Sequence, residues 1–194
     1  MSNEWDEYAG DWDSNEDVVI YSEYAFQSLS KVVSLDELDI LDFGCGTGCL
    51  TEKIAQFANR VVGLDTSSAM LAVLKGKSLP NVDTIDDELS EELVAGHRLL
   101  RSKFDLIVAS SVCGFLSDYE GTLSLLKSLL VRGGLFVQWD WLATEDESEF
   151  GLTENAVLGA LKGADFETVS VSSPFSLASS EGEMSVLMGV GRNA

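Results

Sequence analysis

The sequence predicts an α/β domain in which a mostly parallel sheet is covered by helices on both faces. Short, nearly continuous apolar segments such as FDLIVASS (104–111) alternate with segments whose apolar residues recur at helical spacing. Strands that are apolar throughout are buried on both faces, as they are in parallel sheets. Hydrophobic residues make up 45% of the 194 residues and charged residues 23%, which is typical of a folded globular protein.

Seven apolar segments are expected to form strands: 39–43, 60–65, 82–85, 104–111, 135–141, 167–172 and 185–191. Helices are expected between or before them, where apolar residues repeat at every third or fourth position. These helical segments are 18–32, 50–58, 70–74, 90–101, 123–130 and 152–163. Ser90 followed by Glu91 and Glu92 is typical of a helix start, and Gly133-Gly134 is typical of a helix end.

The chain is strongly acidic, with 12 Lys and Arg against 33 Asp and Glu and a net charge of −21. Such a surface repels phosphate backbones and anionic membranes, so nucleic acids and lipid surfaces are not expected as partners. No apolar segment approaches the roughly 18 residues of a membrane span. The N-terminal segment MSNEWDEYAGDWD lacks the basic start and apolar stretch of a signal peptide. We therefore expect a cytoplasmic protein whose acidity serves solubility or adaptation to salt.

The three cysteines, Cys45, Cys49 and Cys113, are expected to be reduced thiols, because their number is odd and no secretion signal is present. A structural zinc site usually has four Cys or His ligands. Here it would need every cysteine and the single histidine, His97, so no metal site is expected. His97 lies on the apolar face of the 90–101 segment, and we expect it to be packed there rather than to act as a base.

A glycine-rich loop, DFGCGTG (42–48), follows the first expected strand and precedes a helix. Its alternate glycines Gly44, Gly46 and Gly48 allow the backbone to approach a ligand that a Cβ atom would block. Asp65 ends the next strand, and a carboxylate there can accept both hydroxyls of a ribose. Ligands of such sheets bind beyond the carboxyl ends of the strands. The sequence therefore predicts a site for a nucleoside-containing cofactor at this edge.

Two common nucleotide motifs do not fit the loop. The dinucleotide pattern G-x-G-x-x-G requires a third glycine at position 49, which is Cys49. The P-loop pattern requires Lys-Ser or Lys-Thr after the glycines, and neither is present. An NAD-dependent oxidoreductase stays open as an alternative.

The chain resembles the class I S-adenosylmethionine-dependent methyltransferases. Four segments carry the resemblance in the order and spacing of that family: ILDFGCGTG (40–48), VVGLDTSSAML (61–71), FDLIVASSVCGFL (104–116) and LLKSLLVRGGLFVQ (125–138). WDEYAGDWD (5–13) also resembles the opening segment of many members that act on small molecules. The resemblance implies a Rossmann-like, doubly wound sheet of seven strands with an antiparallel last strand, for which MSVLMGVG (184–191) is the candidate. It implies one methyltransferase domain over 1–194, with an N-terminal helical cap or lid (1–35) and a Rossmann-like core (36–194).

The same resemblance implies a site for S-adenosylmethionine. The glycines would hold its amino-acid part, Asp65 its ribose, and one acid of the 86–88 segment its adenine amine. The cofactor-binding residues expected on this basis are Tyr8, Trp12, Asp42, Gly44, Cys45, Gly46, Gly48, Asp65, Thr66, Met70, Asp86, Asp87, Glu88, Ser110 and Ser111. A cleft with several carboxylates attracts a sulfonium cation and repels a pyrophosphate.

The methyl acceptor is expected near the end of the fifth strand. Aromatic and acidic residues there form a candidate pocket for a flat or cationic acceptor: Tyr119, Trp139, Asp140 and Trp141. Methyl transfer depends mainly on alignment, and a general base is needed only for a protonated nucleophile. The sequence therefore defines no catalytic residue, and Asp140 is the candidate for a base or a substrate contact.

The short chain favours a small-molecule acceptor for a methyltransferase of this type. Two alternatives stay open. A protein methyltransferase would use the acidic surface to bind a basic partner, and a non-catalytic module would bind S-adenosylmethionine without transferring its methyl group.

Overall fold

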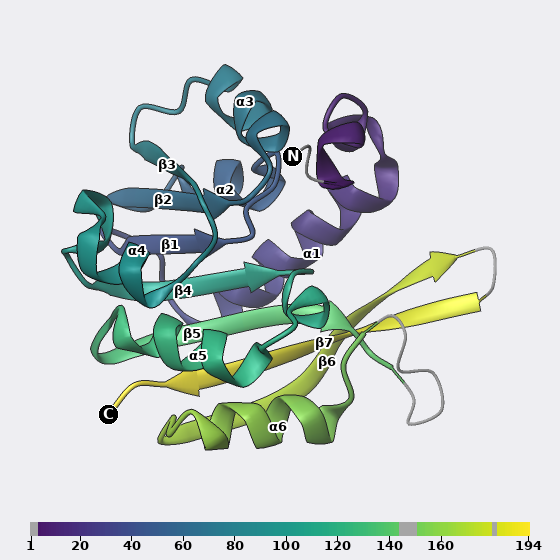
Figure 1. Cartoon of the computed structure of the whole chain (residues 1–194). Coiled ribbons are helices and arrows are strands. Elements are labelled where there is room, and N and C mark those ends of the chain that lie inside the picture. The colour runs from purple at the N-terminus through teal and green to yellow at the C-terminus, as the bar shows by residue number, and fades with distance from the viewer. Residues whose placement is uncertain (1–3, 144–150, 180–181) are drawn as a thin grey trace.

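A computed structural model describes residues 4–143, 151–179 and 182–194 as a seven-stranded sheet flanked by helices (Figure 1). The strands are β1 (Asp39–Phe43), β2 (Arg60–Asp65), β3 (Val82–Asp86), β4 (Phe104–Ser110), β5 (Leu130–Trp141), β6 (Thr168–Ser179) and β7 (Gly182–Arg192). The helices are α1 (Glu16–Val32), α2 (Cys49–Ile54), α3 (Ser68–Gly76), α4 (Glu91–Gly96), α5 (Tyr119–Ser128) and α6 (Glu154–Gly163). Four short 3₁₀ turns join them: η1 (Glu4–Glu7), η2 (Trp12–Ser14), η3 (Arg98–Leu100) and η4 (Cys113–Phe115).

The strand order is β3-β2-β1-β4-β5-β7-β6. Strands β1 to β5 pair in parallel, whereas β7 is antiparallel to both β5 and β6. This arrangement confirms the predicted mostly parallel sheet and the antiparallel last strand. Strand order reverses between β1 and β4, so a crevice forms beyond the carboxyl ends of these two strands.

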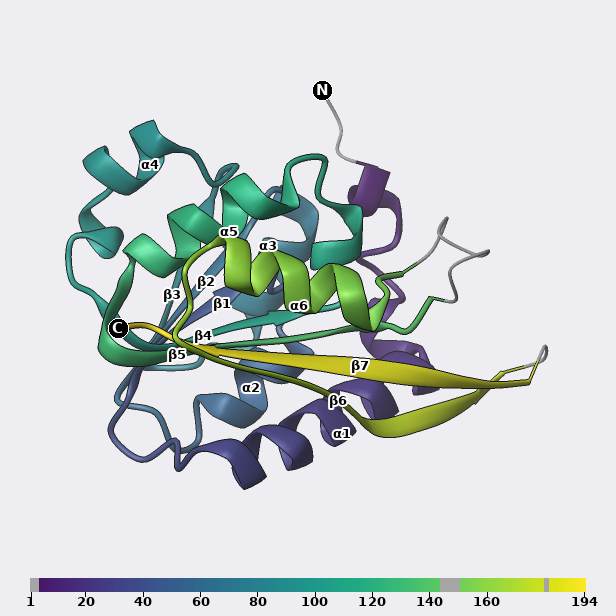
Figure 2. The same ribbon diagram turned by 90° about the horizontal axis from the view of Figure 1, so that it is seen from below.

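The helices form one layer on each face of the sheet. Figure 2 shows α1 and α2 on one side and α4, α5 and α6 on the other. Each face of the sheet has its own hydrophobic core, because successive side chains of a strand point to opposite faces. Ile40 of β1 packs toward α1 and α2, and the next residue, Leu41, packs toward the opposite layer. Both side chains are fully buried. Each such side chain stabilises the fold by roughly 1.5–3 kcal/mol through loss of exposed apolar area.

The two parts of the predicted cap (1–35) occupy different positions. Helix α1 packs on the sheet through Tyr21, Ala25 and Leu29. Residues 4–14 instead lie at the edge where the parallel strands end (Figure 1).

Helix α2 is shorter than the predicted 50–58 segment. It ends at Ile54, and the amides of Phe57 and Ala58 both donate to the Ile54 carbonyl as the chain turns toward β2. The Asn81 side chain donates to the carbonyls of Ala55 and Ala58, which satisfies groups left free at the helix end. Phe57 is consequently half exposed rather than part of the buried helix face.

The predicted 90–101 helix is interrupted at His97. The His97 amide closes α4 by donating to the Leu93 carbonyl, and its Nδ1 accepts a hydrogen bond from the Leu99 amide at the start of η3. The expectation of a histidine on the face of a continuous helix was wrong. His97 has a structural role as a cap between two short helical segments.

Strand β6 is longer than the predicted 167–172 segment and extends to Ser179. Pro174 lies in an irregular stretch of its pairing with β7, between Ser172 and Phe175. A proline is tolerated at this place because β6 is the edge strand of the sheet. No helix within the described ranges is long and apolar enough to cross a membrane.

The excess of acids predicts that salt stabilises this fold. With 33 acids and 12 bases, one-to-one pairing leaves most of the acidic charge uncompensated. Raising sodium chloride from about 0.05 M to about 1 M shortens the Debye length from more than 10 Å to about 3 Å and screens this repulsion. We expect a gain of about 1–2 kcal/mol, which corresponds to a rise of about 2–8 °C in Tm by calorimetry.

A triple variant provides the matched control. Asp83→Asn, Glu167→Gln and Glu183→Gln remove three exposed charges, and the rise in Tm should become smaller. An unchanged or falling Tm of the wild type with salt would contradict the charge-repulsion account.

Candidate functional site

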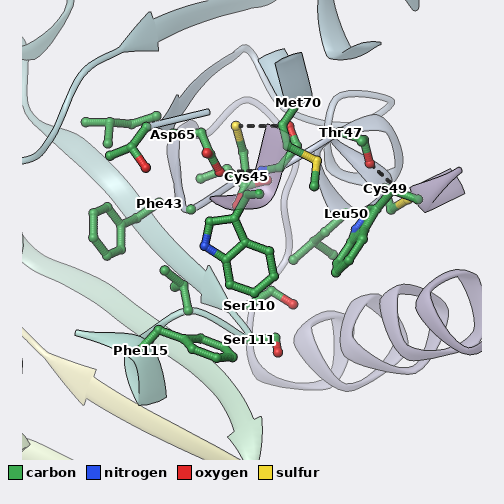
Figure 3. Close-up of a pocket in the computed structure, with 18 of the residues that line it drawn as sticks. Phe43, Cys45, Thr47, Cys49, Leu50, Asp65, Met70, Ser110, Ser111 and Phe115 are labelled. Atoms are coloured by element: carbon green, nitrogen blue, oxygen red, sulfur yellow. Dashed lines mark hydrogen bonds between the residues drawn. The ribbon is translucent and has the colours of Figure 1, made fainter. Parts of the chain in front are cut away.

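A cavity of about 550 Å³ lies beyond the carboxyl ends of β1, β2 and β4. Figure 3 shows residues that line it from different sides, with Cys45 and Asp65 facing Ser110, Ser111 and Phe115 across the space. The expected cofactor-binding residues that line the cavity are Trp12, Asp42, Gly44, Cys45, Gly46, Asp65, Thr66, Met70, Glu88, Ser110 and Ser111. Those outside its lining are Tyr8, Gly48, Asp86 and Asp87.

The glycine loop is held against the end of β2 by backbone hydrogen bonds. The amides of Gly44 and Cys45 donate to the Leu64 carbonyl at 2.8 and 3.2 Å. All three loop glycines have positive φ angles: 69° at Gly44, 54° at Gly46 and 83° at Gly48. This conformation is unfavourable for residues with a Cβ atom.

The three glycines also differ in what surrounds them. A Cβ atom on Gly44 would lie 2.5 Å from Val112, and one on Gly48 would lie 2.4 Å from Leu74. A Cβ atom on Gly46 would meet nothing within 4 Å, although Gly46 lines the cavity. Gly44 and Gly48 thus permit close packing of the loop, and Gly46 presents bare backbone to the cavity. The position of Gly48 outside the lining follows from its contact with α3.

Asp65 links the loop to the start of α3. Its Oδ2 accepts a hydrogen bond from the Gly46 amide at 2.8 Å, and its Oδ1 accepts one from the Ser67 amide at 2.9 Å. A carboxylate oxygen can accept two hydrogen bonds, so each oxygen of Asp65 retains a free lone pair. Because Asp65 lines the cavity, these lone pairs are available to hydroxyl donors of a ligand.

Asp42 is the penultimate residue of β1 and is almost completely buried, with 1% of its surface exposed. Its Oδ2 accepts a hydrogen bond from Thr51 Oγ1 at 2.6 Å, whereas its Oδ1 is buried without a partner. Burial raises the pKa of Asp42 to about 7, and the charge of Asp65 acts in the same direction against the Thr51 hydrogen bond. An unpartnered buried carboxylate oxygen on a cavity wall is a binding point for a cationic or N–H donor.

The N-terminal segment is anchored over the cavity by two carboxylates. Asp6 Oδ1 accepts a hydrogen bond from Ser67 Oγ at 2.6 Å, at the start of α3. Asp13 pairs with Lys77 Nζ at 2.8 Å and accepts a hydrogen bond from Cys49 Sγ at 3.1 Å. Burial would raise the pKa of Asp13, but the Lys77 interaction and the other hydrogen bonds outweigh it and lower that pKa.

Aromatic rings of this segment cover one wall of the cavity. The Trp5 ring meets Phe115 edge-on with centroids 5.2 Å apart, and Trp12 with centroids 6.0 Å apart. Trp5, Trp12 and Phe115 all line the cavity. Tyr8 contacts Trp5 and Trp12, but it is 56% exposed and lies on the outer side of this cluster.

The residues expected to contact the acceptor do not all face the same side of the sheet, because successive side chains of a strand point to opposite faces. Trp139 has no exposed surface, and its Nε1 donates a hydrogen bond to Ser28 Oγ of α1 at 2.8 Å, so Trp139 is a core residue. Asp140 points to the other face and lines a second cavity of about 290 Å³, and Trp141 lines both cavities. Tyr119 lines neither cavity and donates to Gln138 Oε1 at 2.5 Å.

Sequence reasoning missed Tyr21 and Phe115 as cavity residues. Tyr21 follows the helical spacing of α1, so it resembles an ordinary core residue. Phe115 lies in the short turn after β4, where the carboxyl-end rule would have indicated it.

Residues 41–136 match the model of a family described as a methyltransferase domain. The matched segment contains the glycine loop, Asp65 and most of the parallel sheet. The chain contains a class I methyltransferase domain. This family uses S-adenosylmethionine as its methyl donor, as the sequence resemblance implied.

Curated relatives and solved structures agree with this domain. Over 101 residues the chain is 35% identical to trans-aconitate 2-methyltransferase of Deinococcus radiodurans, a match that covers 50% of this chain and 35% of the relative. The chain thus spans about a third of that relative. Magnesium protoporphyrin IX methyltransferase of Synechocystis PCC 6803, solved with bound S-adenosylmethionine, has a TM-score of 0.67 at 18% identity, covering 89% of this chain and 79% of that one.

A further solved structure matches the whole chain. It is a complex of the Haloferax volcanii methyltransferase activator Trm112 with a methyltransferase. Its TM-score is 0.77 at 16% identity, and the alignment covers 100% of this chain and 99% of that one. At this identity the similarity establishes the fold, including the N-terminal segment and the β6–β7 hairpin.

The raised pKa of Asp42 predicts that the stability of the protein depends on pH. A carboxyl group with a folded-state pKa near 7 and an unfolded-state pKa near 4 destabilises the fold as the pH rises between these values. The free energy of unfolding of Asp42→Asn, relative to the wild type, should therefore increase by about 2–4 kcal/mol from about pH 4 to about pH 7. Urea unfolding of both proteins without ligand measures this difference. A constant difference across the range would show that Asp42 titrates normally.

Proposed function

We propose that this methyltransferase transfers a methyl group from S-adenosylmethionine to a small-molecule acceptor by in-line displacement. One observation supports this most strongly. Among the described residues, the buried side-chain oxygens or nitrogens without a hydrogen-bond partner are Asp42 Oδ1 and Tyr21 Oη, and both residues line the same cavity. Buried polar groups are nearly always satisfied, so two exceptions in one cavity indicate groups that a ligand completes.

The residues present fit S-adenosylmethionine. Asp42 Oδ1 suits its cationic amino-acid end, and the bare backbone at Gly46 allows that end to approach closely. The free lone pairs of Asp65 suit the ribose hydroxyls. Met70 supplies an apolar wall for adenine, and Glu88 is the member of the 86–88 segment that lines the cavity.

The charge of the cavity supports a cationic cofactor over a dinucleotide. Among the described lining residues there are carboxylates but no lysine, arginine or histidine. A pyrophosphate would therefore find no cationic partner there, whereas a sulfonium cation is stabilised by the surrounding negative charge. This favours methyl transfer over the NAD-dependent alternative.

The bound cofactor supplies an activated methyl group whose leaving group is neutral. The protein then contributes alignment and exclusion of water, effects worth roughly 7–11 kcal/mol where the reactants are well held. The glycine loop, Asp42 and Asp65 fix the donor end. The rings of Trp5 and Trp12 cover the cavity and exclude water from it.

A small acceptor is favoured over a protein side chain. Residues 4–14 are anchored across the cavity by Asp6 and Asp13, which narrows the access that a folded partner would need. The named relatives act on trans-aconitate and on magnesium protoporphyrin IX, both small molecules.

Isothermal titration calorimetry with S-adenosylmethionine and S-adenosylhomocysteine tests the cofactor assignment. We expect binding to the wild type that Asp65→Ala weakens by about 10- to 100-fold, since hydrogen bonds to a charged group contribute about 1.5–3 kcal/mol each. Asp83→Ala, an exposed acid on β3 outside the cavity, is the matched control and should bind like the wild type. Thermal melts verify folding, and Asp65→Asn preserves the side-chain shape.

The assignment of the cofactor site would be contradicted if the wild type bound neither ligand, or if both Asp65 variants bound the ligands with full affinity. Binding without methyl transfer to a broad set of acceptors would support the non-catalytic alternative.

A further inference from the structure

The second cavity adjoins the proposed cofactor cavity. Ser111, Phe115 and Trp141 line both of them, so the two spaces share a wall at the end of β4 and β5. A methyl acceptor must reach the donor from a neighbouring space, because transfer requires the two reacting atoms in line. The position of the second cavity meets this requirement.

Asp140 is the charged side chain among the described residues that line the second cavity. Its Oδ1 accepts a hydrogen bond from the Gly114 amide at 3.0 Å, and its Oδ2 accepts one from Gln138 Nε2 at 2.9 Å. Tyr119 donates to Gln138 Oε1, which fixes the orientation of that amide. Asp140 is thus held in place by Gln138 and, through it, by Tyr119, and the backbone amide of Cys113 is a further donor to the carboxylate. Three donors leave the carboxylate one of its four lone pairs for a ligand.

Tyr21 of α1 lines the first cavity, next to the wall that the two cavities share. Its hydroxyl is buried without a hydrogen-bond partner of good geometry, and the Ser111 side chain is its polar neighbour. The Tyr21 ring meets Trp141 edge-on with centroids 5.3 Å apart. The shared wall therefore has aromatic rings, with the unpartnered Tyr21 hydroxyl on the side of the first cavity and the oriented Asp140 carboxylate on the side of the second.

The charges around the second cavity favour an acceptor without a net charge. An anionic acceptor would meet Asp140 and no cationic side chain among the described lining residues. A cationic acceptor would be repelled by the sulfonium of the neighbouring cofactor. A neutral acceptor that loses a proton during transfer develops negative charge next to that sulfonium, which stabilises it.

We propose that the second cavity binds a flat, neutral acceptor with a phenolic hydroxyl, that Asp140 is its general base, and that Tyr21 positions the ring. This inference rests on the proposed function. The acceptor oxygen forms a bond to the methyl carbon as the methyl–sulfur bond breaks. The electron pair of that bond stays on the sulfur, which becomes neutral, and the hydroxyl proton moves to Asp140.

The surroundings of Asp140 suit this role. Burial raises its pKa to about 7, against the hydrogen bonds from Gly114 and Gln138, and a base near neutral pKa is effective at physiological pH. The other titratable groups that interact with it are Tyr21 of α1, Cys113 of η4 and Tyr119 of α5. Burial raises the pKa of each well above neutrality, so Asp140 is the member of this group that titrates between pH 5 and 9.

Three single-ring probes of similar size test the acceptor class. Catechol, benzylamine and benzoate present a phenolic hydroxyl, an ammonium group and a carboxylate, and methyl transfer from labelled S-adenosylmethionine is measured for each at saturating cofactor. We expect catechol to be methylated and the other two not. Preference for benzylamine or benzoate, or no transfer to catechol by protein that binds S-adenosylmethionine, would overturn the proposal. Failure to bind S-adenosylmethionine would instead refute the proposed function.

Asp140→Asn tests the base. It should lower kcat for catechol by about 10²- to 10⁴-fold and abolish the rise of the rate with pH through about 7, with cofactor affinity unchanged by calorimetry. Tyr21→Phe should mainly raise KM, and Tyr24→Phe, the same change at a half-exposed position of α1, should have no effect. Retention of the wild-type rate and pH profile by Asp140→Asn would overturn the assignment of the base.

Discussion

The hydrogen bond from the Gly46 amide to the Asp65 carboxylate connects the parts of this structure on which its function depends. It joins the loop after β1 to the end of β2, and the other oxygen of Asp65 joins that loop to the start of α3. Parallel strands bring these ends to the same edge of the sheet. Glycine at position 46 allows the required positive φ and leaves the backbone open toward the cavity. The glycine-loop side of the cavity is therefore fixed by the backbone of the fold.

In the function that we propose, two buried carboxylates have different roles, one in each cavity. Asp42 and Asp140 are the penultimate residues of β1 and β5, and burial raises the pKa of each to about 7. Asp42 has a free oxygen that suits a permanent cation, which would keep it ionised. Asp140 has both oxygens oriented by N–H donors, which suits a group that accepts a proton and is regenerated. Each carboxylate destabilises the empty protein near neutral pH, so stability is lost at the positions where ligands are expected to bind.

Local patterns predicted the elements that are buried on both faces. The bounds of β1 and β2 agree with the apolar segments 39–43 and 60–65. A central parallel strand is buried on both faces, so its apolar residues run from one end of the strand to the other. Prediction failed where tertiary contacts decide the structure. Helix α2 ends early because Asn81, far along the chain, satisfies carbonyls at its end. Strand β6 continues past Pro174 because it lies at the edge of the sheet.

Some residues of the site could likewise be predicted from local sequence patterns, and others could not. The glycine loop and Asp65 are local signals, whereas Tyr21 is hidden within the apolar spacing of α1. Trp139 and Asp140 were grouped by their nearness in sequence, although successive residues of a strand face opposite sides. Trp139 accordingly packs in the core, and Asp140 lines the second cavity.

The most direct test of the central claim is a crystal structure with S-adenosylhomocysteine bound. The account predicts the ligand in the glycine-loop cavity, with its ribose hydroxyls on Asp65. Its amino group should lie within about 3.5 Å of Asp42 Oδ1 or be joined to it by one water molecule. A ligand bound elsewhere, or one that leaves Asp42 Oδ1 without a partner, would contradict the account.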